Sequence, residues 1–312
     1  MGGLTVPELD GATPWTKLPD AARQGWFNFV LVGDRTGGAR PGVFERGLAC
    51  ADLLAPTFAI QLGDLIEGYT DDAAELDQQW SEMDSMLGEL RTPLFHVPGN
   101  HDVSTPEMAA VWDARYGCRY YHFRYDDVLF LVVDTQDPPF DLPPEALAGL
   151  RAFDVQIQKE PARMRRLAEQ YFDWEGKAPA NVSDEQHEYF ERVLAEHADA
   201  RWTFVCMHMP MWQGEHPAWD RLRAALGDRP YTAFAGHVHN YQRRVIDDRD
   251  HIRLGPTGGL WVLGGPDGNF DHVTLVTMTD TEPVITGITL NGVRDSDGQP
   301  ILPVTLMTVP VT

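Results

Sequence analysis

Residues 97–102 read Val-Pro-Gly-Asn-His-Asp and continue an apolar run that begins at Pro93. Such a run is typical of a short buried strand, so an amide, an imidazole and a carboxylate follow each other where the strand ends. Polar side chains at the mouth of a buried strand must be satisfied by each other, by water or by a metal ion. A plain polar turn with Asn100 in the left-handed conformation fits the same residues. Whether similar polar clusters follow other strands decides between a plain turn and a functional site.

Two similar units precede this stretch. Each consists of a buried-strand run, a loop that begins with Gly-Asp or Gly-Asn, and a segment with helical spacing. The strand runs lie at 26–32, 58–62 and 93–97, and the helical segments at 41–54, 72–90 and 106–116. Three such units predict parallel strands joined by right-handed crossovers. We therefore expect all three loops at the same edge of one sheet.

The rest of the chain is rich in strand patterns. A capping box at 183–186 predicts a helix that runs to about 198, and a further helix is expected at 219–226. Strand runs lie at 120–125, 128–133, 202–207, 231–235, 243–246, 251–254, 260–263, 273–278 and 284–290. The first two of these runs predict a β-hairpin. We expect the C-terminal third to form a second sheet packed on the first.

Residues 1–25 contain three prolines and four glycines and show no periodic pattern, which predicts an irregular N-terminal arm. Residues 26–312 are expected to form a single domain. An insertion at 136–182 interrupts the alternation of strand and helix patterns. It opens with several prolines and continues with a helical segment at 161–174. A long segment of this kind is either a cap over a functional edge or a helical excursion without a role. Both interpretations stay open at this point.

Composition narrows the possible partners. The net charge is −22, from 25 basic against 47 acidic residues, which argues against nucleic acids and anionic membranes as partners. No apolar run is long enough to span a membrane, and the N-terminus lacks the pattern of a secretion signal, so a cytoplasmic location is expected. The three cysteines, Cys50, Cys118 and Cys206, lie far apart, and we expect buried reduced thiols.

Ligand-type side chains stand at five separate strand ends. They are Asp34, Asp64, Asn100 with His101 and Asp102, His208, and His237 with His239. The carboxyl ends of strands in an open α/β sheet form a crevice, so these residues should converge. Oxygen and nitrogen ligands without thiolate suit Mn, Fe or Zn. Because the ligands outnumber the four of a closed zinc site, we expect two divalent or trivalent ions and phosphoester hydrolysis.

In this order, the motifs Gly33-Asp34, Gly63-Asp64, Gly99-Asn100-His101-Asp102, His208 and Gly236-His237-Val238-His239 resemble those of the calcineurin-like metallophosphoesterases. This superfamily includes the purple acid phosphatases, and the resemblance spans about residues 27–239. It implies an α/β fold, a four-layer α/β/β/α sandwich of two mixed sheets flanked by helices, with a dinuclear metal centre.

The resemblance also implies roles for the ligands. Asp64 would bridge the two ions, Asp34 and His239 would complete one site, and Asn100, His208 and His237 the other. His101 would stay unligated, contact the phosphate and protonate the leaving oxygen, with Asp102 as its orienter. An imidazole titrates near neutral pH, which suits a general acid. A metal-bound hydroxide would then be the nucleophile.

One position departs from the family pattern. The first motif usually reads Asp-x-His, but Thr36 stands at the third position. Purple acid phosphatases use a Tyr three residues after the bridging Asp, where this chain has Glu67. Either Glu67 or water would then fill the gap, unless Glu67 is a surface residue.

Three further residues are candidates for substrate contacts. Arg35 could bind a phosphate oxygen or pair with a site carboxylate. His216 and Tyr241 lie beside motif residues.

The sequence thus predicts a metal-dependent phosphohydrolase that cleaves a small phosphomonoester or phosphodiester. A cyclic-nucleotide or other phosphodiesterase is the alternative within this class. A metal-binding or protein-interaction scaffold with weak or no catalysis is the alternative of another class. The expected partner is a small phosphorylated substrate, and the sequence leaves the oligomeric state open.

Overall fold

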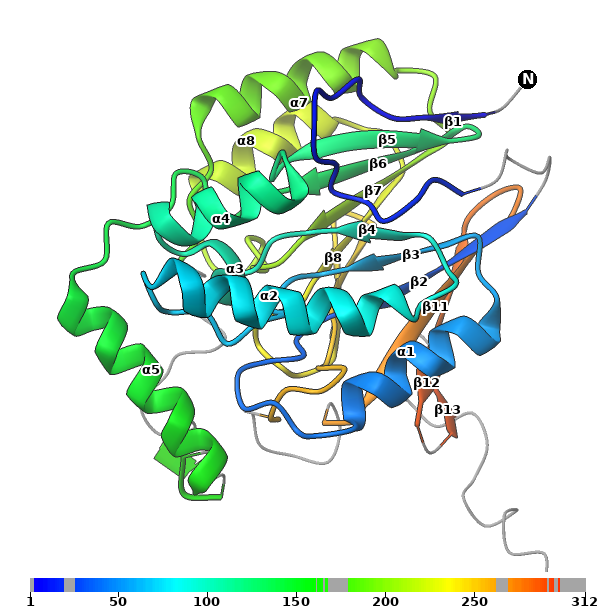
Figure 1. Cartoon of the computed structure of the whole chain (residues 1–312). Coiled ribbons are helices and arrows are strands. Elements are labelled where there is room, and N and C mark those ends of the chain that lie inside the picture. The colour runs from blue at the N-terminus through cyan, green and yellow to red at the C-terminus, as the bar shows by residue number, and fades with distance from the viewer. Residues whose placement is uncertain are drawn as a thin grey trace, which may run out of the picture.

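Two mixed β-sheets face each other in the computed structural model of this chain (Figure 1). The structure describes residues 3–19, 26–160, 162–164, 166–167, 179–261, 269–290, 292–294 and 297. The seven-stranded sheet has the order β1(Leu4–Thr5), β5(Tyr121–Tyr125), β6(Val128–Val133), β7(Trp202–Met207), β8(Tyr231–Ala235), β10(Arg249–Arg253), β9(Gln242–Ile246). The six-stranded sheet has the order β13(Gly292–Arg294), β12(Pro283–Thr289), β11(His272–Met278), β2(Phe27–Val32), β3(Phe58–Gln61), β4(Leu94–His96).

Aromatic side chains fill the space between the two sheets. The Phe29 and Phe58 rings of one sheet stack at 5.5 Å, and Phe130 of the other sheet meets Phe29 edge-on at 5.2 Å. Buried rings of this size each remove a large apolar area from water and lock neighbouring side chains in place. The core therefore fixes one sheet against the other, and with it the strand ends that carry the polar loops.

Helices cover the two outer faces. α1(Val43–Leu54), α2(Ala73–Gly88) and α4(Pro106–Tyr116) pack on the six-stranded sheet, while α7(Asp184–Glu196) and α8(Pro217–Leu226) pack on the seven-stranded one. The predicted start of α7 is confirmed, because the Ser183 hydroxyl accepts a hydrogen bond from the Gln186 backbone at 3.1 Å. The expected α/β/β/α layering is thus confirmed.

The sequence led us to expect that the C-terminal strands form a second sheet by themselves. Instead, they are divided between the two sheets. β10 pairs in parallel with β8 and extends one sheet, whereas β11 pairs antiparallel with β2 and extends the other. Strand periodicity identifies strands but not their partners. Of the strand expected at 260–263, Leu260 and Trp261 lie outside any strand, and 262–263 lie outside the described residues.

The N-terminal arm is more ordered than predicted. β1 pairs antiparallel with β5, and Trp15 forms a bridge to Phe95. Two-residue strands carry no periodic signal, so the prediction of an irregular arm was wrong there.

The burial of the three cysteines differs from the prediction that all are buried. Cys206 is buried, but Cys50 and Cys118 are only half-buried.

The insertion contains a helix that the sequence analysis missed. α5(Pro144–Lys159) begins where the proline-rich opening ends, with Pro144 in its first turn. Proline is favourable at that position because its missing N–H has no helical partner there. The predicted helix at 161–174 lies mostly outside the described residues. No described helix has the length and apolar character to cross a membrane.

Candidate metal centre

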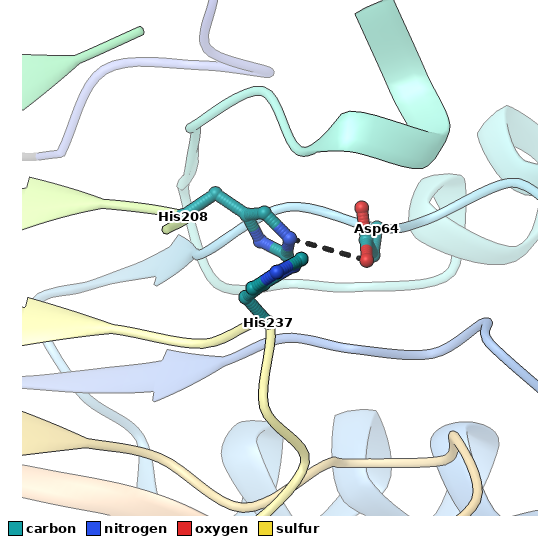
Figure 2. Close-up of side chains that lie close together, drawn as sticks. All are labelled: Asp64, His208 and His237. Atoms are coloured by element: carbon teal, nitrogen blue, oxygen red, sulfur yellow. Dashed lines mark ion pairs between the residues drawn. The ribbon is translucent and has the colours of Figure 1, made fainter. Parts of the chain in front are cut away.

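The predicted ligands converge where strands of both sheets end. Asp34, Asp64 and His239 form one group in which single ligand atoms lie within 4.8 Å of one another, and Asp64, His208 and His237 form a second. Figure 2 shows the second group, with both imidazole rings beside the Asp64 carboxylate. Asp64 belongs to both groups. The convergence therefore joins β2 and β3 of one sheet to β7 and β8 of the other, rather than one edge of one sheet as predicted.

The ligand loops leave their strands in a strained backbone conformation. Asp34, Asp64, His237 and His239 have positive φ angles of 50°, 58°, 71° and 57°. Non-glycine residues rarely adopt this region, at a cost of about 1–3 kcal/mol each, and they do so mainly at functional sites. At Gly63 (φ 94°) the approach is so close that a Cβ would lie 2.5 Å from His208 Nδ1. This turn therefore needs glycine.

His208 has the hydrogen-bond pattern of a metal ligand. Its Nδ1 lies 2.7 Å from the Leu62 carbonyl, which only accepts, so Nδ1 carries the proton. Its Nε2 lies 3.1 Å from Asp64 Oδ2 and 2.9 Å from Asn100 Oδ1. When the ring is neutral, His208 Nε2, Asp64 Oδ2 and Asn100 Oδ1 all present lone pairs and none carries a proton to share. A bound cation would accept these lone pairs.

Asn100 is held in place by Tyr69. The amide Nδ2 of Asn100 donates to the Tyr69 hydroxyl at 2.6 Å, which leaves Oδ1 directed at His208. Both side chains are buried. Tyr69 was not among the predicted site residues, and nothing in the local sequence apart from its place five residues after Asp64 pointed to it.

The other group has a matching arrangement. His239 Nδ1 lies 2.6 Å from the Leu260 carbonyl, and its Nε2 lies 3.7 Å from Asp34 Oδ1. Asp34 Oδ1 also accepts from the His237 backbone at 2.9 Å, whereas Oδ2 is buried and has no hydrogen-bond partner among the described residues. An unpaired buried carboxylate oxygen is costly. The residues present therefore fit bound cations.

Electrostatics agree with a site built for positive charge. Burial alone would raise the pKa of Asp64, but His208 and His101 outweigh it and hold this pKa well below its usual range. Burial would lower the pKa of His208, yet Asp64 raises it to about 9. Burial, reinforced by His208, lowers the pKa of His237 to about 3. Without a metal, a proton on His208 supplies the positive charge that the carboxylates require.

His101 faces the shared carboxylate without joining either group. Its backbone N–H donates to Asp64 Oδ1 at 2.9 Å, and its ring Nε2 lies 3.9 Å from Asp64 Oδ2. The other ring nitrogen, Nδ1, lies 2.8 Å from the Glu67 carbonyl. Burial alone would lower the pKa of His101, but the negative charges of Asp64 and Asp154 outweigh this effect. The pKa of His101 therefore lies above its ordinary value.

The predicted contact between Asp102 and the His101 ring is wrong. The Asp102 carboxylate instead accepts from the backbone N–H groups of Asp64, Leu65 and Gly99 at 2.8–2.9 Å. Both residues lie in the short helix α3(Asn100–Val103), where consecutive side chains point in different directions. Asp102 therefore ties the β3 and β4 loops together, and the Glu67 carbonyl orients the ring.

The Glu67 carboxylate does not lie where the missing histidine of the first motif would be. The Glu67 carboxylate groups with His101 and Asp154 rather than with Asp34 and His239, and its Oε1 accepts from Gln158 at 3.3 Å. Thr36 is buried, and its hydroxyl has no hydrogen-bond partner in the described part of the chain. The structure thus gives no support to Glu67 as the replacement for the missing histidine.

None of the remaining candidates belongs to the groups of ligand atoms among the described residues. Arg35 Nη1 donates to the Leu65 carbonyl at 2.9 Å, and the described residues include no ion pair between Arg35 and a site carboxylate. Tyr241 is 6% exposed and packs in the core against Phe270, with the rings 5.5 Å apart. His216 is 4% exposed at the start of α8.

Asp154 is the second site residue that the sequence analysis missed. It projects from α5, and its Oδ2 lies 3.9 Å from His101 Nδ1. Burial raises the pKa of Asp154 to about 6, against the opposing effect of His101. No local pattern links a carboxylate inside the insertion to the strand-end loops.

Comparisons with known proteins agree with the fold. The structure of a dimetal phosphatase from Danio rerio superposes with a TM-score of 0.56 at 15% identity, covering 84% of this chain and 96% of that one. PhoD gives 0.55 at 11% identity, covering 89% and 71%. GAP50, the anchor in the inner membrane complex of Plasmodium, gives 0.51 at 14% identity, covering 89% and 88%. At such identities these likenesses concern the fold.

A search of curated protein sequences found no match. The family model of the calcineurin-like phosphoesterases, however, matches residues 27–241, which is more than half of the chain and includes every predicted metal ligand. The chain therefore belongs to the calcineurin-like phosphoesterase family.

Proposed function

We propose that this phosphoesterase hydrolyses a small phosphate monoester or diester at a dinuclear metal centre. The observation that carries the proposal is the sharing of Asp64 by two groups of ligand atoms, as a bridging carboxylate requires. Two ions held there would activate a water molecule and neutralise the charge of the phosphate. The oxygen and nitrogen donors suit Mn, Fe or Zn as divalent or trivalent ions.

The chain's own residues would share the work. Asp34 and His239 would hold one ion, and Asn100, His208 and His237 the other. In the neutral rings, backbone carbonyls at Leu62 and Leu260 hold the proton on Nδ1 and leave Nε2 of His208 and His239 as the metal-binding atom. Such contacts orient the ligands before any metal binds.

His101 would supply the proton for the leaving oxygen. Its Nδ1 proton stays with the Glu67 carbonyl, so Nε2, on the side of Asp64, is the atom that gives up its proton as the P–O bond breaks. Asp64 and Asp154 raise the pKa of the ring above its ordinary value, which favours the protonated form that a general acid needs. Asp102 would act indirectly, by holding the Asp64 backbone.

The test combines metal analysis with two chromogenic substrates. Protein purified from metal-supplemented culture should contain close to two transition-metal ions per chain and hydrolyse p-nitrophenyl phosphate or its bis-ester with added Mn, Zn or Fe. Asp64→Asn should lose both properties. Asp10→Asn, the same change at an exposed residue of the N-terminal segment, should lose neither. Bound metal without hydrolysis of either ester would favour the scaffold alternative.

A further inference from the structure

Helix α5 of the insertion, at the left of Figure 1, contacts loops that follow the strands carrying the candidate ligands. Ile157 contacts the loop after β2, where a Cβ on Gly38 would lie only 2.6 Å from Ile157 Cγ2. Gln158 Nε2 donates to Glu67 Oε1 at 3.3 Å in the loop after β3. Arg151 Nη1 donates to Glu75 Oε2 at 2.9 Å at the start of α2. The helix is therefore attached to three separate parts of the site edge.

The docked face of α5 contains a carboxylate. Its buried residues are Leu147, Asp154 and Ile157, and Asp154 is 9% exposed. A carboxylate in the contact face of a helix costs stability unless a positive group compensates it. Its Oδ2 lies 3.9 Å from Nδ1 of the His101 ring, which is the ion pair that the structure gives Asp154. A hydrophobic residue would dock the helix better, so the carboxylate calls for another explanation.

We propose that Asp154 is a positioning residue for His101, through which the insertion takes part in protonation of the leaving group. This inference rests on the proposed phosphoester hydrolysis. Asp154 approaches the Nδ1 edge of the ring, beside the Glu67 carbonyl, and leaves the Nε2 edge toward Asp64 and the substrate. Its carboxylate stands against that edge of the ring, and the docking of α5 holds the two side chains in register. Asp154 itself does not touch the reacting atoms.

The leaving group of the substrate provides the decisive test. A p-nitrophenolate leaves without help from an acid, whereas an alkoxide needs a proton. Asp154→Asn should lower kcat for an alkyl phosphate about tenfold to a hundredfold, part of the 10²–10⁴-fold that general acid catalysis supplies. For p-nitrophenyl phosphate the loss should stay below about threefold. Asp154→Glu should restore part of the alkyl activity.

Two comparisons separate positioning from structural damage. Glu145→Gln removes an exposed carboxylate from the same helix and should leave both substrates unaffected. If Asp154 acts through His101, then Asp154→Asn should add little to the loss already caused by His101→Asn. Equal losses on both substrates, or losses that multiply in the double variant, would overturn the proposal.

A readout without turnover completes the test. In metal-free protein, the ¹⁵N signals of the His101 ring, assigned by their absence in His101→Asn, should shift in Asp154→Asn but not in Glu145→Gln. Unchanged signals would overturn the inference even if the protein proved inactive on every ester. Metal content should match the parent protein, because loss of an ion from Asp154→Asn would make Asp154 a metal ligand instead. Inactive parent protein with shifted signals would refute only the proposed hydrolysis.

Discussion

His208 and His101 both turn an imidazole toward Asp64, and in both rings Nδ1 meets a backbone carbonyl. Their Nε2 atoms differ. That of His208 lies 3.1 Å from Asp64, with Asn100 Oδ1 at 2.9 Å as a third donor, whereas that of His101 stands 3.9 Å away from the same carboxylate. Around His208, three atoms with lone pairs face one another. Between the His101 ring and the Asp64 carboxylate, the longer distance leaves space.

The surroundings differ as well. His208 follows a central strand and is enclosed by the two sheets, while His101 lies where the insertion helix closes over the loops. The same residue type can thus serve as a metal ligand or as a proton donor, depending on which atoms face Nε2 and which element covers Nδ1. The predictions below test this division.

The largest effect should come from His208. His208→Asn removes a donor from the point where three electron pairs meet, so the chain should retain fewer than two ions, measured by elemental analysis after dialysis. Activity should fall on the order of 10³-fold or more, because bound metal supplies several kcal/mol of transition-state stabilisation. His197→Asn, at the end of α7, is the matched control. Full metal content in His208→Asn would remove this residue from the centre.

His101 should show the opposite pattern of metal and activity. His101→Asn should keep the parent metal content, yet lose about 10²–10⁴-fold in kcat on an alkyl phosphate. The reason is that its Nε2 stands back from the ligand groups but faces the shared carboxylate. Parallel metal analysis and kinetics of the two variants make the comparison direct. If His101→Asn also lost metal, the proposed division between the two histidines would fail.

The sequence predicted the ligands but not their supports. Asp34, Asp64 and His208 are predictable because each directly follows a buried strand, and strand ends bring distant residues together. Their origin in two sheets was not predictable, since the pairing of β10 with β8 leaves no local signal. Asp154 was missed because its contact with His101 depends on how a whole helix docks.

Asp102 illustrates the reverse error. Proximity in the chain suggested contact with His101, but helical geometry turns the two side chains apart.

Tyr69 should have a smaller effect, through the ligand that it holds. Tyr69→Phe removes the hydroxyl that accepts from Asn100 Nδ2, so the amide can rotate away from the metal. Loss of such a supporting contact typically weakens metal binding about 10–100-fold. Titration of metal-free protein in chelator-buffered Zn should measure the change, with Tyr120→Phe as the control. Equal affinities would mean that the peptide backbone alone positions Asn100.

The last prediction concerns stability and a histidine that neither binds metal nor transfers a proton. His96 ends β4, stacks on Tyr116 with ring centroids 4.7 Å apart, and burial lowers its pKa to about 4. The unfolded chain, with a pKa near 6.5, then binds the proton more readily than the folded one. Stability from the neutral ring is complete above pH 6.5 and is lost as the pH falls toward 4, by on the order of 3 kcal/mol.

Urea unfolding of the metal-free protein between pH 7 and 4 would measure this loss for His96. His96→Gln should lower stability at pH 7 but flatten its dependence on pH, because glutamine takes up no proton. An unchanged pH dependence would assign the acid sensitivity to other groups. A flattened one would add a third environment to the comparison, in which full burial against an aromatic ring outweighs the opposing effect of Asp84 and keeps an imidazole neutral.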